Sequence, residues 1–439
     1  MATDPAAARL ADELAGLILR AGLKSGDLVA SEQDLRTRHD VGRSVLRQAA
    51  RILEARGVAF MKRGAGGGLI VAPPDPEAAG RALAILIESR MQGPHATDRL
   101  LKATDTHVFL TATPRLDLAE CEGVRQVALR LSRQSRIGPP RMGEIRQLLT
   151  AIRRLVKDPL ASLAYQATAE YGQDIVPYSV MAGGQGFQKA WWDALLEMIE
   201  AQMAGDVAAL FALRDRQLAL MRDSQATWSA MERDERQVPA IEDEGAGGGN
   251  PAERLARELL RDVRLLEWTP GARIGGAGDL LERYGVTVST LRQAVRMLEQ
   301  HSVVRMERGR SGGLVVALPD AERALGRSLE FLRQTDVQPG DLASFRRQIG
   351  LKSLSAISEM PAAVRSQILQ DVDPTRSLTN LGALSGDSAL EIFSIIGCRL
   401  DPAPECAPDR MTPLILDALH RGDAARARRI FMSREQERA

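Results

Sequence analysis

The sequence predicts a mainly α-helical protein with small β-hairpin wings: two winged helix-turn-helix domains, each followed by an α-helical bundle. Two observations lead to this fold class. The first is an internal repeat, because residues 25–75 align without a gap over residues 270–320 with 24 of 51 positions identical. The second is composition: 44% of the residues are hydrophobic but only 4% are aromatic. That balance favours cores made of Leu- and Ala-rich helices.

The repeat divides the chain into five predicted segments. These are a first winged domain (1–75), a first helical domain (76–235), an acidic Gly-rich linker (236–252), a second, partly degenerate winged domain (253–319) and a shorter second helical domain (320–439). The linker prediction rests on the run EDEGAGGGN, whose composition is typical of a flexible connection. An AGD tripeptide late in the first helical domain has an RGD counterpart late in the second. The larger unit is therefore also expected to be duplicated.

Within the first repeat, the pattern predicts a helix, a short capped helix, a tight turn, a third helix and a β-hairpin. The corresponding segments are 6–21, 31–38, 39–42, 43–56, 58–62 and 69–72. Ser31 followed three residues later by Asp34 resembles a capping box. Gly57 ends the third helix, and the glycine run at 64–68 turns the hairpin.

Local charge in this repeat differs from that of the whole chain. A formal net charge of +1 argues against a uniformly cationic surface. Between Arg36 and Arg63, however, eight Lys or Arg residues stand against Asp40 and Glu54. Arginines four residues apart share one face of the third helix. Arg43, at the N-terminal end of that helix, is the predicted base-reading residue, because Arg pairs with guanine edges in the major groove.

These residues resemble the GntR-type bacterial transcription regulators, in the FadR branch whose helical effector domain is called FCD. The resemblance rests on SGDLVASEQDL, VGRSVLRQAARILEARG and GAGGGLIV, at 25–35, 41–57 and 64–71. It implies a helix facing DNA and a wing along the phosphate backbone, with Gln33 replacing a phosphate-binding Arg of many relatives. The DNA-binding residues predicted for the first copy are Arg43, Ser44, Arg47, Arg51, Lys62, Arg63 and Gly67.

The second copy departs from the first at positions that face DNA in relatives. Val288 replaces Arg43, and Glu307 replaces Lys62. Weaker DNA binding is expected, through contacts to phosphate more than to bases. The residues predicted to make them are Ser289, Thr290, Arg292, Arg308 and Arg310. The alternative is a degenerate module kept for packing against the first.

Both helical stretches resemble FCD domains, but this resemblance is weaker than that of the winged modules to the DNA-binding domains of GntR-type regulators. The segment at 377–387, SLTNLGALSGD, is similar to a family segment in which a His precedes a Leu and a Ser-Gly-Asn, with Leu378 standing where that His would be. Many FCD domains bind a divalent metal through one Asp and three His. This chain has five His in all, and none lies between His107 and His301. Neither a His-rich metal site nor a cofactor is expected.

A small-molecule effector, if one binds, is expected to be a carboxylate held by the first helical domain, since Arg matches a carboxylate in bidentate fashion. The candidate ligand-binding residues are Arg115, Arg153, Tyr165 and Tyr171. The alternative is that these are ordinary helix-surface residues.

The expected function is sequence-specific regulation of transcription, with a double-stranded DNA operator as partner. The two modules predict an intramolecular pseudo-dimer, and a homodimer stays open. The alternative function is a protein-interaction adaptor that binds little DNA. No enzyme is expected, because the glycine runs lack the spacing of a phosphate-binding or dinucleotide-binding loop.

A cytoplasmic location and no membrane partner are expected. The apolar runs are too short to span a bilayer, and the N-terminal region does not resemble a signal peptide. Cys121, Cys398 and Cys406 are widely spaced, which favours reduced thiols over a disulfide framework.

Overall fold

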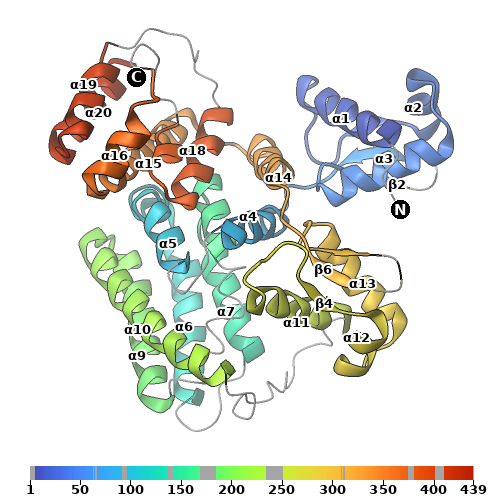
Figure 1. The fold of residues 1–439 in the computed structure, drawn as a ribbon, viewed down its shortest axis with the longest axis horizontal. Coiled ribbons are helices and arrows are strands. Elements are labelled where there is room, and N and C mark those ends of the chain that lie inside the picture. Colours follow the sequence, from blue (N-terminus) through green and yellow to red (C-terminus); the bar gives the residue numbers. More distant parts are fainter. Residues whose placement is uncertain are drawn as a thin grey trace.

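The computed structural model describes residues 5–62, 64, 67–90, 96–135, 142–168, 184–233, 251–307, 309, 312–373, 380–400 and 410–438. It is mostly helical, with two small antiparallel sheets (Figure 1). The expected fold class is confirmed: each sheet belongs to a winged module, and helices make up the described parts of the rest. No helix in the described ranges combines the length and apolar character that a bilayer crossing requires.

The first winged module forms its own core around three helices and a three-stranded sheet. Its elements are α1 (Pro5–Arg20), β1 (Leu28–Ala30), α2 (Glu32–His39), α3 (Arg43–Ala55), β2 (Ala59–Lys62) and β3 (Gly68–Val71). The strand order is β1-β3-β2, antiparallel throughout. The hairpin β2–β3 matches the prediction, but β1 was missed, because three residues carry too little alternation to indicate a strand.

The second winged module repeats this arrangement. Its elements are α11 (Pro251–Leu265), β4 (Arg273–Gly275), α12 (Ala277–Tyr284), α13 (Val288–Glu299), β5 (Val304–Met306) and β6 (Leu314–Val316). The strand order is β4-β6-β5. Its core also takes in Ile85 from the first helical domain, and Arg264 donates to the Glu88 carboxylate at 2.5 Å. The second module is therefore docked on that domain.

A glycine at the start of each wing's return strand has the same structural cause in both modules. A Cβ on Gly68 would lie 2.3 Å from the carbonyl oxygen of Ala30, and one on Gly313 would lie 2.6 Å from that of Gly275. The first strand of each sheet passes so close that no side chain fits between the backbones. The shared glycines of the repeat thus report a shared packing constraint.

The helical domains follow the modules. The first contains α4 (Pro76–Arg90), α5 (Ala96–His107), the short turns Val108–Ala112 and Thr113–Arg115, α6 (Leu118–Ser135), α7 (Met142–Arg154), a helix over 159–168, α9 (Gly184–Ala204) and α10 (Val207–Arg233). The second contains α14 (Ala321–Gln334), α15 (Pro339–Glu359), α16 (Ala362–Leu369), α17 (Leu381–Leu384), α18 (Ser388–Leu400), α19 (Thr412–His420) and α20 (Ala424–Arg438).

The last helix pair of each domain turns in the same way. Gly205 (φ +69°) links α9 to α10, and Gly422 (φ +72°) links α19 to α20. The next residue caps the following helix: the Asp206 carboxylate accepts from the backbone N–H of Ala209, and the Asp423 carboxylate accepts from that of Arg426. The AGD and RGD tripeptides are therefore equivalent turns.

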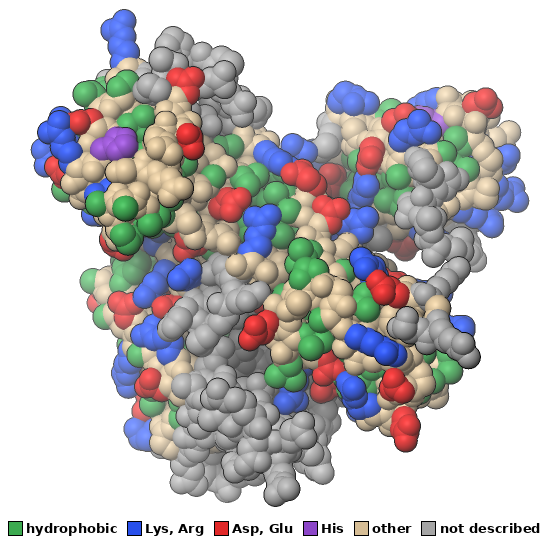
Figure 2. Space-filling model, in the orientation of Figure 1, with side chains coloured by type: hydrophobic (Ala, Val, Ile, Leu, Met, Phe, Trp, Pro, Cys, Tyr) green, Lys and Arg blue, Asp and Glu red, His purple; other side chains and the backbone are tan. Residues whose placement is uncertain are grey.

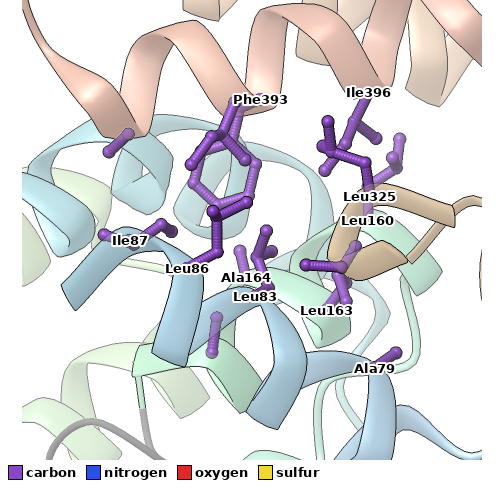
Figure 3. Close-up of a cluster of buried hydrophobic side chains, with 14 of the residues drawn as sticks. Ala79, Leu83, Leu86, Ile87, Leu160, Leu163, Ala164, Leu325, Phe393 and Ile396 are labelled. Atoms are coloured by element: carbon purple, nitrogen blue, oxygen red, sulfur yellow. The ribbon is translucent and has the colours of Figure 1, made fainter. Parts of the chain in front are cut away.

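The two helical domains share one hydrophobic core. Helix α4 packs against α14, its counterpart in the repeat, and α18 closes over both. Figure 3 shows Leu83, Leu86 and Leu163 of the first domain meeting Leu325 and Phe393 of the second. These five side chains are buried. The two halves of the chain are thus joined through a continuous apolar core.

A polar contact reinforces this junction. The Arg115 guanidinium donates two hydrogen bonds to the Asp341 carboxylate, both at 2.6 Å. A second carboxylate, that of Asp158, lies 3.5 Å from the same guanidinium. One arginine of the first helical domain therefore bridges a carboxylate from each of the two helical domains.

Candidate nucleic-acid interface

Helix α3 presents a buried face and a cationic face, as its sequence pattern predicts. Leu46, Ala49 and Leu53 are buried in the core of the first module. The exposed residues of the opposite side include Arg43, Ser44, Arg47 and Arg51. In Figure 2, Lys and Arg side chains gather on the outer surface of this module, the lobe at the upper right. The predicted arginine ridge is therefore free to meet a ligand.

Arg43 lies at the first position of α3, where it meets a carboxylate. Its Nε is 3.1 Å from Oε1 of Glu32 at the start of α2, and the two side chains are 62% and 37% exposed. Pairs between exposed groups contribute about 1 kcal/mol or less. Glu32 can therefore orient Arg43 and still leave the guanidinium available to a ligand.

The turn between α2 and α3 is fixed locally. Ser31 caps α2, its Oγ accepting from the backbone N–H of Asp34 at 3.1 Å, so the predicted cap is confirmed. Asp40 ends the helix in the left-handed region, φ 49°. The second module has Gly285 at this position, with φ 60°. Both modules thus aim the third helix through the same backbone turn.

The first wing contributes one described cation. Lys62 is exposed at the end of β2, paired across the hairpin with Gly68. The N–H of Gly67 donates to the carbonyl of Gly64 at 2.9 Å, which tightens the tip. Arg63 lies outside the described residues.

Comparison with known proteins settles what these modules are. The family model described as bacterial regulatory proteins, gntR family, matches residues 6–68 and 251–313. The chain carries two gntR-family domains in tandem. Such domains are DNA-binding modules of transcription regulators. No curated protein matches the chain.

The second gntR-family domain keeps the helix geometry with altered chemistry. The Thr287 side chain caps α13, accepting from the backbone N–H of Thr290 at 3.3 Å. Ser289 and Arg292 are exposed, and Thr290 is partly buried. In the wing, Glu307, directly after β5, pairs with Arg305 at 2.5 Å. Arg308 and Arg310 lie outside the described residues.

Two linked differences separate the third helices of the two gntR-family domains. Where the first has the Glu32–Arg43 ion pair, the second has Ala277 and Val288. Both partners of the pair have been replaced, and Val288 is 51% exposed at the first position of α13. An exposed valine at this position contributes nothing to the module's core. The first turn of α13 therefore presents an exposed apolar group where α3 presents a guanidinium.

The candidate effector residues have separate partners in the structure. Arg115 binds Asp341, as described above. Arg153 donates to the carbonyl of Leu149 at 3.0 Å on its own helix, and Tyr165 accepts from Arg214 at 3.1 Å. Tyr171 lies outside the described residues, as does Leu378. A carboxylate pocket built from these side chains stays a prediction.

Tyr165 belongs to a buried polar cluster that the sequence did not indicate. Arg214 donates to the Asp105 carboxylate at 3.2 Å and to the Gln217 side chain at 2.5 Å. Burial raises the pKa of Asp105 and that of Tyr165. Asp105 and Arg214 lie 109 residues apart in the chain, so no local pattern could have paired them.

His107, a histidine of the first helical domain, contacts a buried carboxylate. His107 Nε2 lies 3.2 Å from Oδ1 of Asp158, and both side chains are buried. The Thr111 hydroxyl lies 3.4 Å from the other ring nitrogen. Within the described ranges, no three His, Cys, Asp or Glu residues come together as a metal site.

Proposed function

We propose that this chain is a sequence-specific transcription regulator whose two unequal modules bind the two halves of one asymmetric operator. The observation that carries the proposal is the shared core of the helical domains. It joins two non-identical gntR-family domains through one body, and both modules lie on the same side of the helical domains in Figure 1. Symmetric dimers of helix-turn-helix proteins bind half-sites about one helical turn apart. Here a single chain supplies both modules.

The first module supplies base recognition. Arg43 is exposed at the N-terminus of α3, where major-groove readers place the side chains that contact base edges. Its guanidinium matches the O6 and N7 acceptors of guanine. Arg47, Arg51 and Lys62 are exposed beside it, and they are proposed to bind phosphates.

The second module supplies a different half-site. Ser289, Thr290 and Arg292 keep hydrogen-bond donors near the start of α13, but Val288 has none in its side chain. An apolar side chain at that position contacts the C5-methyl group of thymine instead of a guanine edge. The operator is therefore expected to differ between its halves. The helical domains are proposed to act as FCD-like domains, with a small carboxylate as effector.

The test is fluorescence anisotropy of the full chain on chromosomal promoter fragments at 50 and 200 mM salt. A protein that makes 6 to 10 phosphate contacts loses roughly 10³- to 10⁵-fold in affinity over this range. Light scattering on the complex should find one chain per operator. Two chains with four modules would contradict the pseudo-dimer, and absence of binding at both salts would favour the protein-interaction adaptor.

A further inference from the structure

A cluster of cationic side chains lies where the winged modules meet the paired helices α4 and α14. Arg327 of α14 is only 8% exposed. Its Nη1 lies 3.4 Å from Nδ1 of His301, just beyond the end of α13. His301 and Arg56 occupy equivalent positions of the repeat, and the charge of Arg56 also acts on Arg327. Both modules thus approach the same guanidinium.

No acidic side chain neutralises Arg327 within the described part of the chain. Its Nε makes no hydrogen bond. Burial, followed by the charges of Arg323 and Arg56, lowers its pKa to about 10. Burial and the charges of Arg327, Arg81 and Arg323 lower the pKa of His301 to about 3. The ring is therefore neutral at physiological pH.

The nearby carboxylates of Asp12 and Glu330 interact with arginines other than Arg327. Asp12 accepts a hydrogen bond from the Arg56 guanidinium at 2.5 Å. The Glu330 carboxyl accepts from the Gln334 side chain at 3.4 Å and interacts with the charges of Arg333 and Arg56. Arg56 therefore has carboxylate partners of its own, whereas the charged groups that act on Arg327 are Arg323 and Arg56.

The fold itself does not require a cation at this position. The residue of α4 equivalent to Arg327 is Ala82, which is buried in the same helix pairing. A buried charge without a partner destabilises a protein, and replacing it by an apolar side chain of similar volume is often stabilising. A function that needs the charge would explain why arginine stands here.

We propose that Arg327 is the floor of a binding site for a small multivalent oxyanion, a phosphate or a polycarboxylate. Arg323, which is exposed on the preceding turn of α14, stands at its rim, and the neutral ring of His301 can donate a hydrogen bond once its proton sits on the nitrogen facing the anion. Charge-assisted hydrogen bonds from arginine favour oxyanions. A bound anion would tie the second module to α14. The effect of the anion on the second module rests on the proposed function, but the binding site itself does not.

A phosphate of the DNA backbone has the same chemistry as a free anion. With 92% of its surface covered, Arg327 is out of reach of a duplex unless the modules move, so the proposal commits to a free anion. A DNA phosphate is an outcome that the experiment can distinguish.

The experiment measures thermal unfolding and titration calorimetry of the full chain with inorganic phosphate and with citrate, at constant ionic strength against chloride. Arg327→Met is the test variant, and Arg333→Gln, an exposed arginine on the same helix, is the matched control. Phosphate or citrate should raise the melting temperature of the wild type and of Arg333→Gln. Arg327→Met should bind the anion at least tenfold more weakly and, without anion, should melt no lower than the wild type.

Three results would overturn the proposal. They are an unchanged anion response in Arg327→Met, no response in the wild type to either anion, and a lower melting temperature of the variant in chloride alone. The DNA arm repeats the anisotropy measurement without phosphate. Unchanged operator affinity in Arg327→Met supports the free anion, whereas a loss with a salt slope reduced by about one assigns the site to a DNA phosphate. A chain that binds phosphate through Arg327 but no DNA would refute only the proposed function.

Discussion

Leu83 gives the sharpest test of the junction between the two halves of the chain. It lies on α4, is 0% exposed, and belongs to the cluster that also contains Leu325 and Phe393 from the other half. Truncation to alanine removes apolar contacts from both domains at once. If the halves form one cooperative body, Leu83→Ala should loosen helices of the second half that are more than 200 residues away in sequence.

The magnitude follows from burial. A fully buried Leu→Ala substitution costs about 2 to 5 kcal/mol, the larger values applying where neighbours cannot relax into the space. At Leu83 the surrounding side chains come from several helices of both domains (Figure 3), so collapse is restricted and about 3 kcal/mol is expected. Such a loss is a large fraction of the 5 to 15 kcal/mol that stabilises a typical protein.

Hydrogen exchange followed by mass spectrometry provides the readout, since it resolves stability along the chain. In Leu83→Ala, exchange should accelerate in peptides from α14 and α18 as well as in α4. The control is Leu148→Ala on α7, which is buried (1% exposed) in a separate cluster made only by the first domain. That control should affect α6, α7 and α9 and leave α18 unchanged. Acceleration confined to the first half in both variants would refute a shared core.

Three further predictions concern DNA and pH. Arg43→Ala should weaken binding to the preferred operator by about 1 to 3 kcal/mol while changing the free energy of unfolding by less than about 1 kcal/mol, because the Glu32 pair is exposed; anisotropy on preferred and scrambled DNA checks this, and equal losses on both would remove its base-reading role. The double substitution Ala277→Glu with Val288→Arg should give the second half-site a guanine preference, measured by selection from randomised half-sites; an unchanged preference would contradict the assigned helix position. The pKa of His301 is lowered to about 3 in the folded chain, so between pH 6.5 and 3 the His301 ring is protonated in the unfolded chain but neutral in the folded one. The free energy of unfolding should therefore fall as the pH drops through this range. His301→Asn should lack this contribution, roughly 2 kcal/mol between pH 7 and pH 5 by urea titration, and identical slopes would exclude it.

The winged modules were predictable because their signals are local. The Ser31 cap, the arginine ridge and the glycine wing each depend on residues a few positions apart, and each is where the pattern places it. The strand β1 escaped because it is too short to show a period, and its partner β3 lies some 40 residues away. Local periodicity therefore indicated the helices and the hairpin but not the full sheet.

The candidate effector site was harder to predict because its residues are defined by distant partners. No neighbouring residue in the sequence indicates a partner for Arg115, yet its guanidinium binds the carboxylate of Asp341, 226 residues away. Arg214 and Asp105 were missed for the same reason. Residue type alone cannot separate an arginine that awaits a ligand from one already paired within the fold.

Covalent duplication explains how the modules could come to differ. In a symmetric dimer every substitution is present in both subunits, so replacing an arginine such as Arg43 removes that contact from both half-sites. In a tandem chain, Val288 can replace it in one module while the other keeps it, and the linked partner is held at high effective concentration. The same freedom allows Arg327 on α14 opposite Ala82 on α4. Positions at which the two repeats differ are therefore the best candidates for functions that a symmetric regulator with two identical subunits does not have.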